Sequence, residues 1–359
     1  MAETVGLDIG TTAVRAALVA TSKGAPVLKR YGEVGLPPGA VVNGEIVDDG
    51  VVADAITRLF KQAKLPKKRV VVGMANQRVI VRQVLLPQQS EEELAQSLAF
   101  QAQEFIPIPI DEAVLDFVPL EDVVAADGAA QMSVLVIAAQ KDMASELLEV
   151  VNKVGVKPLS FDLQAFALVR SLNLGSFNLD PNARVIVNIG ASITQVIVSK
   201  GGSLRFLRII PMGGQDFTRR LADDMSISRE EAEELKKRIG VARSDAPPME
   251  GDDGKAQAAL TAQADILIEE IRSSIDFYVS QNPEGAMDRL YISGNGTRLS
   301  FLAARMMSAL NMQLDTIRLL ADGEGALHED RRLGLDENQK KLIVPVLPIA
   351  AGLAMWGEV

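Results

Sequence analysis

The sequence contains no cysteine and a single histidine, His328, among its 359 residues. The absence of thiols excludes disulfides, a thiolate nucleophile and cysteine-held zinc or iron–sulfur centres. A single imidazole also excludes metal sites built from several histidines. His328 stands in the polar stretch GEGALHEDRR, where we expect a solvated loop residue rather than a catalytic base.

Aromatic residues are scarce, at 4% of the sequence, whereas hydrophobic residues make up 48%. Val, Ile, Leu, Ala and Met must therefore fill the core, which favours an α/β fold over an aromatic-rich β-sandwich. The length of 359 residues suits two domains or one large duplicated domain.

The sequence also lacks a positive net charge and a long apolar run. Its formal net charge is −10 and its pI is about 4.9, which argues against nucleic-acid binding through phosphate neutralisation. No apolar run reaches the ~18 residues that a membrane-spanning helix requires. The opening MAETVGLDIG enters a strand directly, so we expect no signal peptide and a cytoplasmic protein without direct membrane insertion.

Two similar stretches occur far apart in the chain. VGLDIGTTAVRAALVA at 5–20 and VIVNIGASITQVIVSKGG at 185–202 both read as a strand, a small turn after Ile-Gly, and a second strand. A third glycine turn, ISGNGTRL at 292–299, lies between a predicted strand and a predicted helix. The repeat predicts two halves of similar build that face each other across a site touched by both turns.

Periodicity predicts several further elements. A helix is expected over 49–64, with Val52, Ile56, Leu59 and Phe60 on one face. Ser90 and Glu93 form a capping-box pattern at the start of another helix, which prolines at 107 and 109 end.

The remaining patterns predict how the chain is organised. Residues 78–156 read as a compact strand–helix–strand–strand–helix unit inserted after the first strands. An acidic loop is expected over 244–255, followed by a long helix to about 281. The apolar stretch PVLPIAAGLAMWGEV predicts a short C-terminal helix packed into a core.

The first glycine turn, DIGTT, has the chemistry of a phosphate site. Gly10 lets a ligand approach the backbone, and a concave set of amides binds phosphate. Asp8 fits beside phosphate when a cation lies between them, which suits Mg²⁺ held through water. Arg15 is close enough in sequence to contact a β- or γ-phosphate. An ordinary β-hairpin is the alternative, and the three glycine turns together favour the ligand site.

Other phosphate and nucleotide motifs are missing. The chain has no Walker A sequence, and ISGNGTRL is not a full G-x-G-x-x-G, which disfavours a dinucleotide fold. Gly294 and Gly296 would let a flat adenine lie against the backbone.

The three glycine turns, in this order, resemble the actin-like ATPase superfamily, with phosphate turns at 7–15 and 187–195 and an adenosine turn at 291–299. Within it, the chain resembles the PilM family of type IV pilus assembly proteins, which is related to the cell-division protein FtsA. The segment LLPQQSEEELAQSLAFQAQEFIPIPIDEAVLDFVPL carries the family-specific part, and IGASITQVIVSKGG and RIIPMGGQDFTRRLA also match.

This resemblance implies an α/β fold of the duplicated actin-like (ribonuclease H-like) type with an FtsA-type 1C subdomain. The expected boundaries are 1–77, 157–184 and 346–359 for subdomain 1A, 78–156 for 1C, 185–222 and 287–345 for 2A, and 223–286 for 2B.

The resemblance also implies the roles of single residues toward ATP and Mg²⁺. Asp8 would hold Mg²⁺ through water, Arg15 stands where relatives often have a phosphate-contacting lysine, and Gln164 would orient the attacking water. The expected nucleotide-binding residues are Asp8, Gly10, Thr11, Thr12, Arg15, Asn188, Gly190, Ser192, Thr194, Gly213, Gly214, Glu233, Lys236, Gly294, Asn295 and Gly296.

One residue departs from the pattern of the superfamily. The second phosphate motif usually begins with Asp, and this chain has Asn188 there. A neutral amide polarises Mg²⁺-bound water less than a carboxylate does. The sequence therefore predicts an ATP-binding scaffold or switch that is at most a slow Mg²⁺-dependent ATPase.

The implied partner is the N-terminal cytoplasmic peptide of a PilN-like inner-membrane protein, docked between subdomains 1A and 1C. The candidate contact residues are Val84, Leu86, Phe100, Phe105 and Ile106, each of which is equally well a core residue of 1C. Contacts with other pilus assembly proteins and self-association are further expectations. The chain stops without the C-terminal amphipathic helix of FtsA, so we expect attachment to the inner face of the cytoplasmic membrane through the partner.

Two other functions remain as alternatives. The opening GLDIGTTAVRAAL also resembles sugar kinases, which would require a catalytic carboxylate such as Asp162 near the cleft. A filament-forming actin homologue is the second alternative. Activators of radical dehydratases share the fold but need cysteines for their cluster, so the composition excludes them.

Overall fold

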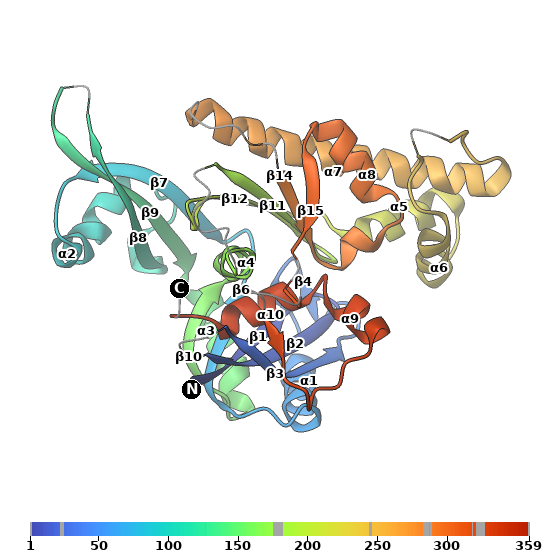
Figure 1. Cartoon of the computed structure of the whole chain (residues 1–359), viewed down its shortest axis with the longest axis horizontal. Helices are drawn as coiled ribbons and strands as arrows, with labels where there is room; N and C mark the ends of the chain where they lie inside the picture. The colour runs from blue at the N-terminus through green and yellow to red at the C-terminus, as the bar shows by residue number, and fades with distance from the viewer. Residues whose placement is uncertain are drawn as a thin grey trace.

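The computed structural model describes residues 2–21, 25–125, 127–174, 182–243, 246–282, 287, 289–317, 319–320 and 327–357. Within these residues the chain forms two lobes, each built on a mixed β-sheet, and a smaller unit to one side (Figure 1).

The sheet of the first lobe contains six strands within the described residues. They are β1 (Ala2–Ile9), β2 (Ala13–Thr21), β3 (Val27–Gly35), β6 (Lys68–Met74), β10 (Lys157–Leu163) and β16 (His328–Glu329). Their order is β10-β6-β1-β2-β3-β16, in which β1, β2 and β3 are antiparallel and β6 and β10 run parallel to β1.

The sheet of the second lobe repeats this arrangement. Its strands are β11 (Arg184–Ile189), β12 (Thr194–Lys200), β13 (Ser203–Ile210), β14 (Arg289–Ser293) and β15 (Gln313–Thr316), in the order β13-β12-β11-β14-β15. Strands β11, β12 and β13 are antiparallel, and β14 runs parallel to β11.

The two hairpins close with the same hydrogen bond. The N–H of Gly10 donates to Ala13 at 3.0 Å, and the N–H of Gly190 donates to Ile193 at 2.8 Å. The repeated strand–turn–strand predicted at the two stretches is therefore confirmed, and so is the duplicated α/β architecture.

Each lobe carries its own helices (Figure 1). The first lobe has α1 (Asp49–Gln62), α3 (Lys141–Lys153), α4 (Gln164–Leu172) and α10 (Leu347–Ala354), with a small hairpin of β4 (Val41–Val42) and β5 (Glu45–Ile46). The second lobe has α5 (Gly214–Met225), α6 (Arg229–Ile239), α7 (Gly251–Gln281), the 3₁₀ turn η4 (Asn295–Arg298) and α8 (Leu302–Leu310), and α9 (Glu337–Ile343) follows.

The smaller unit is a three-stranded sheet with one helix. Strands β7 (Val79–Pro87), β9 (Ala130–Gln140) and β8 (Ala113–Val124) pair in that order, with α2 (Glu91–Gln101) on one face and the short turns η1 (Ala102–Glu104) and η2 (Ile110–Glu112) after it. The capping box at Ser90 is confirmed, because its Oγ accepts from the N–H of Glu93 and Glu93 Oε2 accepts from the N–H of Ser90.

Strand β9 is buried on both faces, which ties this unit to the rest of the molecule. Val134 and Val136 pack with Leu94 of α2. The alternate residues Leu135 and Ile137 join the core that contains α4 and α10. Since one strand contributes to both cores, the buried part of β9 anchors the unit to the first lobe.

Two predicted boundaries differ from the packing. Helix α3 lies at the end of the predicted inserted unit, but Leu147 and Val151 belong to the core of the first lobe with α1. Strand β16 lies within the stretch assigned to subdomain 2A, yet it pairs with β3. We propose that the inserted unit ends at about Gln140 and that the first lobe includes β16.

Three local expectations can be compared with the structure. Helix α1 is confirmed, with Val52, Ile56, Leu59 and Phe60 all buried. The predicted loop over 244–255 is too long, because α7 begins at Gly251 with acidic residues in its first turn, where they favour the helix dipole. Residues 244 and 245 of that loop lie outside the described residues. His328 is exposed as expected, but its backbone forms β16 rather than a loop.

The predicted C-terminal helix is confirmed as α10, and its described residues are buried throughout. A Cβ built on Gly352 would lie 1.9 Å from the carbonyl oxygen of Ala167 in α4. The backbones of α10 and α4 therefore touch, which holds α4 firmly against the first lobe. Among the described residues, no helix combines the length and apolar character needed to cross a membrane.

Candidate functional site

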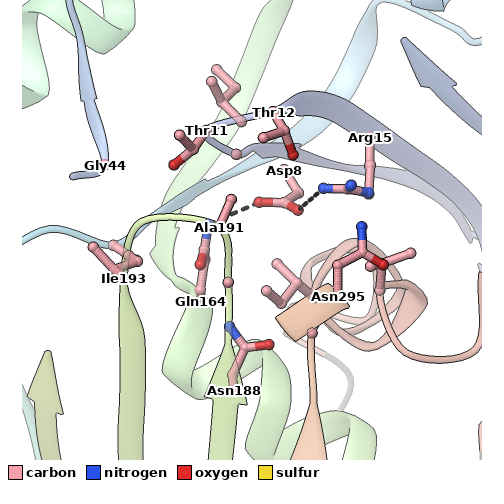
Figure 2. A pocket seen from close by; sticks show the side chains of 17 residues that line it. Asp8, Thr11, Thr12, Arg15, Gly44, Gln164, Asn188, Ala191, Ile193 and Asn295 are labelled. Carbon is pink, nitrogen blue, oxygen red and sulfur yellow. Dashed lines mark hydrogen bonds and ion pairs between the residues drawn. The ribbon is translucent and has the colours of Figure 1, made fainter. Parts of the chain in front are cut away.

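The two glycine turns meet at the junction of the lobes. Thr11 Oγ1 and Ser192 Oγ lie 2.6 Å apart, which joins the turn after β1 to the turn after β11. Beside this contact lies a cavity of about 620 Å³, including the solvent space at its mouth, which we call the inner cavity (Figure 2). Its lining residues are Asp8, Ile9, Gly10, Thr11, Thr12, Arg15, Gly44, Ala75, Gln164, Asn188, Gly190, Ala191, Ile193, Gly294, Asn295, Val346 and Ile349.

A second cavity, the outer cavity, continues from the first. Thr12, Gly190, Ala191 and Asn295 line both. The other residues of the outer cavity are Gly214, Gln215, Phe217, Glu233, Lys236, Lys237, Gly296, Arg298 and Leu299. The two cavities form one elongated site that runs from the paired turns to α6 and η4.

Gly294 is required by both conformation and space. Its φ of +89° is unfavourable for other residues, and a Cβ there would lie 2.3 Å from the carbonyl oxygen of Ile189. The N–H of Gly294 donates to Pro345 at 2.6 Å, which fixes the turn after β14. The third glycine turn is therefore held directly against the end of β11.

Asp8 is a buried carboxylate at the end of β1 (Figure 2). Its Oδ1 accepts a hydrogen bond from Gln164 Nε2 at 2.8 Å, and its Oδ2 lies 3.9 Å from an Arg15 nitrogen. Burial raises the pKa of Asp8 from its usual 3.8 to about 6, because Arg15 compensates only part of the desolvation. At neutral pH the buried carboxylate is ionised, and this buried charge lowers the stability of the folded protein.

Arg15 is shared among acidic partners. Its Nε and one terminal nitrogen donate to Glu33 at 3.0 and 3.3 Å, and Tyr31 donates to the same carboxylate at 3.1 Å. Asp8, Arg15 and Glu33 are direct neighbours across β1, β2 and β3, which explains their alignment. Glu33 was not among the sequence candidates, and only strand register reveals its contact with Arg15.

A chain of amides crosses between the lobes. Gln164 at the start of α4 donates to Asp8, and its Oε1 accepts from Gln195 Nε2 of β12 at 2.8 Å. Gln195 was also missed by the sequence analysis. The sequence did contain a signal for Gln195: it is a polar residue within an apolar strand, and in the hairpin it pairs directly with Asn188.

Glu233 and Lys236 of α6 are tied to the start of α5. Lys236 Nζ donates to Glu233 at 2.6 Å and to the carbonyl oxygen of Gly214 at 3.1 Å, and Thr218 donates to Glu233 at 2.6 Å. This cluster forms the wall of the outer cavity on the side of α6.

Most of the sequence candidates line one or both cavities, and three do not. Ser192 contacts Thr11, Thr194 donates to the carbonyl oxygen of Met212 at 2.8 Å, and Gly213 packs against the backbone of Ala191. These three residues therefore make contacts within and around the second turn but do not line either cavity.

The candidate peptide-contact residues lie in different environments. Leu86 and Ile106 are buried in the core beneath α2, and Val84 and Phe105 pack partly against it. Phe100 is 77% exposed. The segment that follows α2 lines a shallow hollow, whose residues are Gln103, Ile106, Ile108, Pro109, Ile110 and Asp111.

Comparisons with known proteins define the class of the fold. The structure is similar to MreB5 of Spiroplasma citri bound to ADP, with a TM-score of 0.53 and 13% identity over 96% of this chain and 97% of that one. In sequence, the chain is 24% identical to the cell division protein FtsA of Bacillus subtilis over 266 residues. That match covers 67% of this chain but only 59% of FtsA. The fold is that of the actin-like ATPases.

The particular family follows from two closer matches. The family model for the type IV pilus assembly protein PilM matches residues 6–358. A solved PilM–PilN type IV pilus biogenesis complex superposes with a TM-score of 0.83 and 25% identity, over 99% of this chain and 98% of that chain. The chain belongs to the PilM family of type IV pilus assembly proteins.

The raised pKa of Asp8 predicts a stability effect with a defined sign. Between about pH 4 and pH 6 the folded protein keeps a proton that the unfolded chain has lost, so the free energy of unfolding falls as pH rises through this window. We expect Asp8→Asn to raise the unfolding free energy at pH 7.5 by up to about 3 kcal/mol.

Denaturant unfolding at two pH values checks this effect. At pH 4 Asp8 is protonated in the folded state, so we expect Asp8→Asn to raise the free energy of unfolding only slightly there. The measurement at pH 4 is therefore the control for the measurement at pH 7.5. A variant that is less stable than the parent at pH 7.5 would contradict the interpretation.

Proposed function

We propose that the chain binds Mg·ATP in the interlobe cleft and acts as a nucleotide-loaded scaffold or switch with slow or no hydrolysis. The observation that carries this proposal is the meeting of two equivalent glycine turns beside the buried carboxylate of Asp8. The inner cavity suits phosphates and the outer cavity suits the nucleoside, because the third glycine turn and α6 wall the outer end.

The residues of the inner cavity fit Mg²⁺. Asp8 is the only carboxylate among the described residues that line it, and its pKa is raised by burial. A cation near Asp8 would offset the desolvation of its charge, and Mg²⁺ keeps several waters when bound this way. Bound there, Mg²⁺ would neutralise phosphate charge, while Asp8 and Gln164 hold its water shell in place.

Slow turnover is supported by the second strand pair. Asn188 occupies the cavity floor, where it supplies a neutral amide instead of a second carboxylate. Asp162, the candidate base for a sugar kinase, forms an ion pair with Arg170 and lines neither cavity. The described site therefore favours binding over phosphoryl transfer to a sugar.

The first test is nucleotide retention. The purified protein is incubated with Mg·ATP, desalted, denatured, and its bound nucleotide identified by chromatography. We expect intact ATP after about an hour, because the described lining of the inner cavity contains no carboxylate besides Asp8 to speed hydrolysis. Retained ADP would show real turnover, and no retained nucleotide would refute the ATP-binding function.

Replacing the amide on the cavity floor should speed hydrolysis. Asn188→Asp adds a second carboxylate to the inner cavity that Asp8 lines, so we expect the single-turnover rate to rise by about tenfold or more. Asn173→Asp is the matched control, because Asn173 is also buried but lines neither cavity. An unchanged rate with normal ATP binding would contradict this explanation of slow turnover.

We further propose that a PilN-like N-terminal cytoplasmic peptide docks between the first lobe and the inserted unit. A PilM relative was solved in complex with PilN, and this chain shares its fold over nearly the full length. Such a partner would place the protein at the inner face of the membrane. A switch requires that peptide affinity differ between the ATP, ADP and empty states.

Phe100 offers a clean test of this docking site. Because its side chain is 77% exposed, Phe100→Ala should leave the unfolding temperature unchanged while weakening peptide binding by about tenfold. Fluorescence anisotropy with the labelled peptide measures the affinity. Leu342→Ala, at a side chain that is 58% exposed on α9, is the control. Equal affinities of the two variants would remove Phe100 from the interface.

A further inference from the structure

The charge of the chain is unevenly distributed along the sequence. Although the formal net charge is −10, residues 55–90 contain eight Lys and Arg and no Asp or Glu. Six of these cations fall within 58–69, and all six are exposed: Arg58, Lys61, Lys64, Lys67, Lys68 and Arg69. A basic cluster on an otherwise acidic protein indicates a surface that attracts an anionic partner.

The fold places the end of this segment at the amino ends of two parallel strands. Lys68 begins β6 and Lys157 begins β10, and the two residues pair directly in the sheet. The inner cavity lies at the opposite ends of these strands, because its lining includes Ala75 after β6 and Gln164 after β10. The cations therefore lie on a side of the first lobe that the nucleotide site does not use.

The connection from α1 to β6 is held in place at three points. Arg30 of β3 donates a hydrogen bond to the carbonyl oxygen of Lys64. Lys67 Nζ donates to the carbonyl oxygen of Val154 at 2.6 Å, and the carbonyl oxygen of Lys67 accepts from the N–H of Lys157 at 2.7 Å. Because the connection is tied to β3, β10 and the end of α3, its lysines belong to a fixed surface rather than to a flexible arm.

A hollow of about 880 Å³, including the solvent space at its mouth, continues this surface toward β16, and we call it the basic hollow. Its lining residues are Glu3, Leu18, Lys29, Arg30, Lys64, Asp330, Arg332 and Leu333. Lys29 forms an ion pair with Asp330 at 2.8 Å, so Glu3 is the one other carboxylate among the described residues that line the hollow. With four cations against two carboxylates, the basic hollow suits a phosphate group.

Together these cations cross the width of the first sheet. Lys157 belongs to β10 at one edge, and Arg332 follows β16 at the other edge, so five strand spacings, or about 24 Å, separate the two ends. A single small anion does not span this width, whereas a surface that carries many anions does. We call the following set the basic belt: Lys29, Arg30, Lys64, Lys67, Lys68, Lys157 and Arg332.

We propose that the basic belt contacts anionic phospholipid headgroups at the inner face of the membrane, with one headgroup phosphate in the basic hollow. The cytoplasmic leaflet has a negative surface potential that attracts clusters of Lys and Arg. The inference rests on the proposed function, because the PilN-like partner would bring the first lobe to this membrane. The contact is electrostatic and reversible, and it adds a second attachment that is independent of the peptide.

Vesicle binding by the purified chain, without any peptide, tests this contact. A protein with a net charge of −10 is repelled by an anionic vesicle unless its positive charge is gathered on one face. We expect co-sedimentation with phosphatidylcholine vesicles that contain about 40% phosphatidylglycerol, and at least about tenfold weaker binding to phosphatidylcholine alone. Raising NaCl from about 50 to about 500 mM should release the protein, because salt screens exposed charges.

Charge reversal within the belt gives the decisive variant. The triple variant Lys64→Glu, Lys68→Glu, Lys157→Glu should weaken binding to the anionic vesicles by about tenfold or more. All three side chains are exposed, and within the part of the chain that the structure describes they form no hydrogen bond or ion pair. The unfolding temperature and ATP retention should therefore stay unchanged.

The matched control reverses three exposed cations of the second lobe, in the triple variant Arg229→Glu, Lys255→Glu, Arg289→Glu. The two triple variants have the same net charge, so a general repulsion from the vesicle would weaken both equally. Loss of binding in the belt variant alone would support the proposal, and equal loss in both would overturn it.

The remaining outcomes separate the source of the anion and the two proposals. Equal binding to neutral vesicles, or release from anionic vesicles by about 5 mM inorganic phosphate, would overturn the assignment to a lipid surface. So would binding to a DNA duplex in place of vesicles at the same salt concentration. A chain that binds the labelled peptide but no anionic vesicle would overturn the role of the basic belt alone. A chain that binds anionic vesicles but not the peptide would overturn the docking proposal and support the lipid contact.

Discussion

The burial of Asp8 is the constraint on which the rest of the site depends. The Asp8 carboxylate at the end of β1 is buried, and Arg15 compensates its desolvation only in part. Gln164 and Gln195 extend its hydrogen bonding across the lobe junction. The lobes therefore meet at a charged group whose burial lowers the free energy of unfolding at neutral pH. If the proposed Mg·ATP binds in this cleft, the cation would offset that cost and raise the free energy of unfolding.

Duplication of one strand pattern places two turns face to face. The hairpins of β1–β2 and β11–β12 close with equivalent hydrogen bonds, and both lie in sheets in which five strands follow the same order, with β16 added to the first. Aliphatic residues fill the shared core, in which α4 and α10 pack closely enough for Gly352 to touch the backbone of Ala167. The start of α4, where Gln164 lies, is thus held by tight packing, so the amide reaches Asp8 from a rigid support.

Much of the fold was predictable because its signals are local. The paired Ile-Gly turns, the capping box at Ser90 and the apolar face of α1 each depend on residues a few positions apart. The side of the molecule on which an element packs depends on distant partners. Helix α3 follows the inserted strands in sequence, yet its apolar face fits the core of the first lobe. Strand β16 likewise pairs with β3 across most of the chain length.

The sequence by itself determined the duplicated α/β fold, the three glycine turns and the acidic residue beside the first turn, since these are set by short spacings and composition. Only the tertiary structure decided which side chains surround Asp8. Glu33 aligns with Arg15 through strand register, and Gln195 reaches Gln164 from the opposite lobe. Thr194 stood in a phosphate motif but turns to the carbonyl oxygen of Met212. Hydrogen bonds between segments far apart in sequence depend on side-chain direction after the lobes meet, which no local pattern encodes.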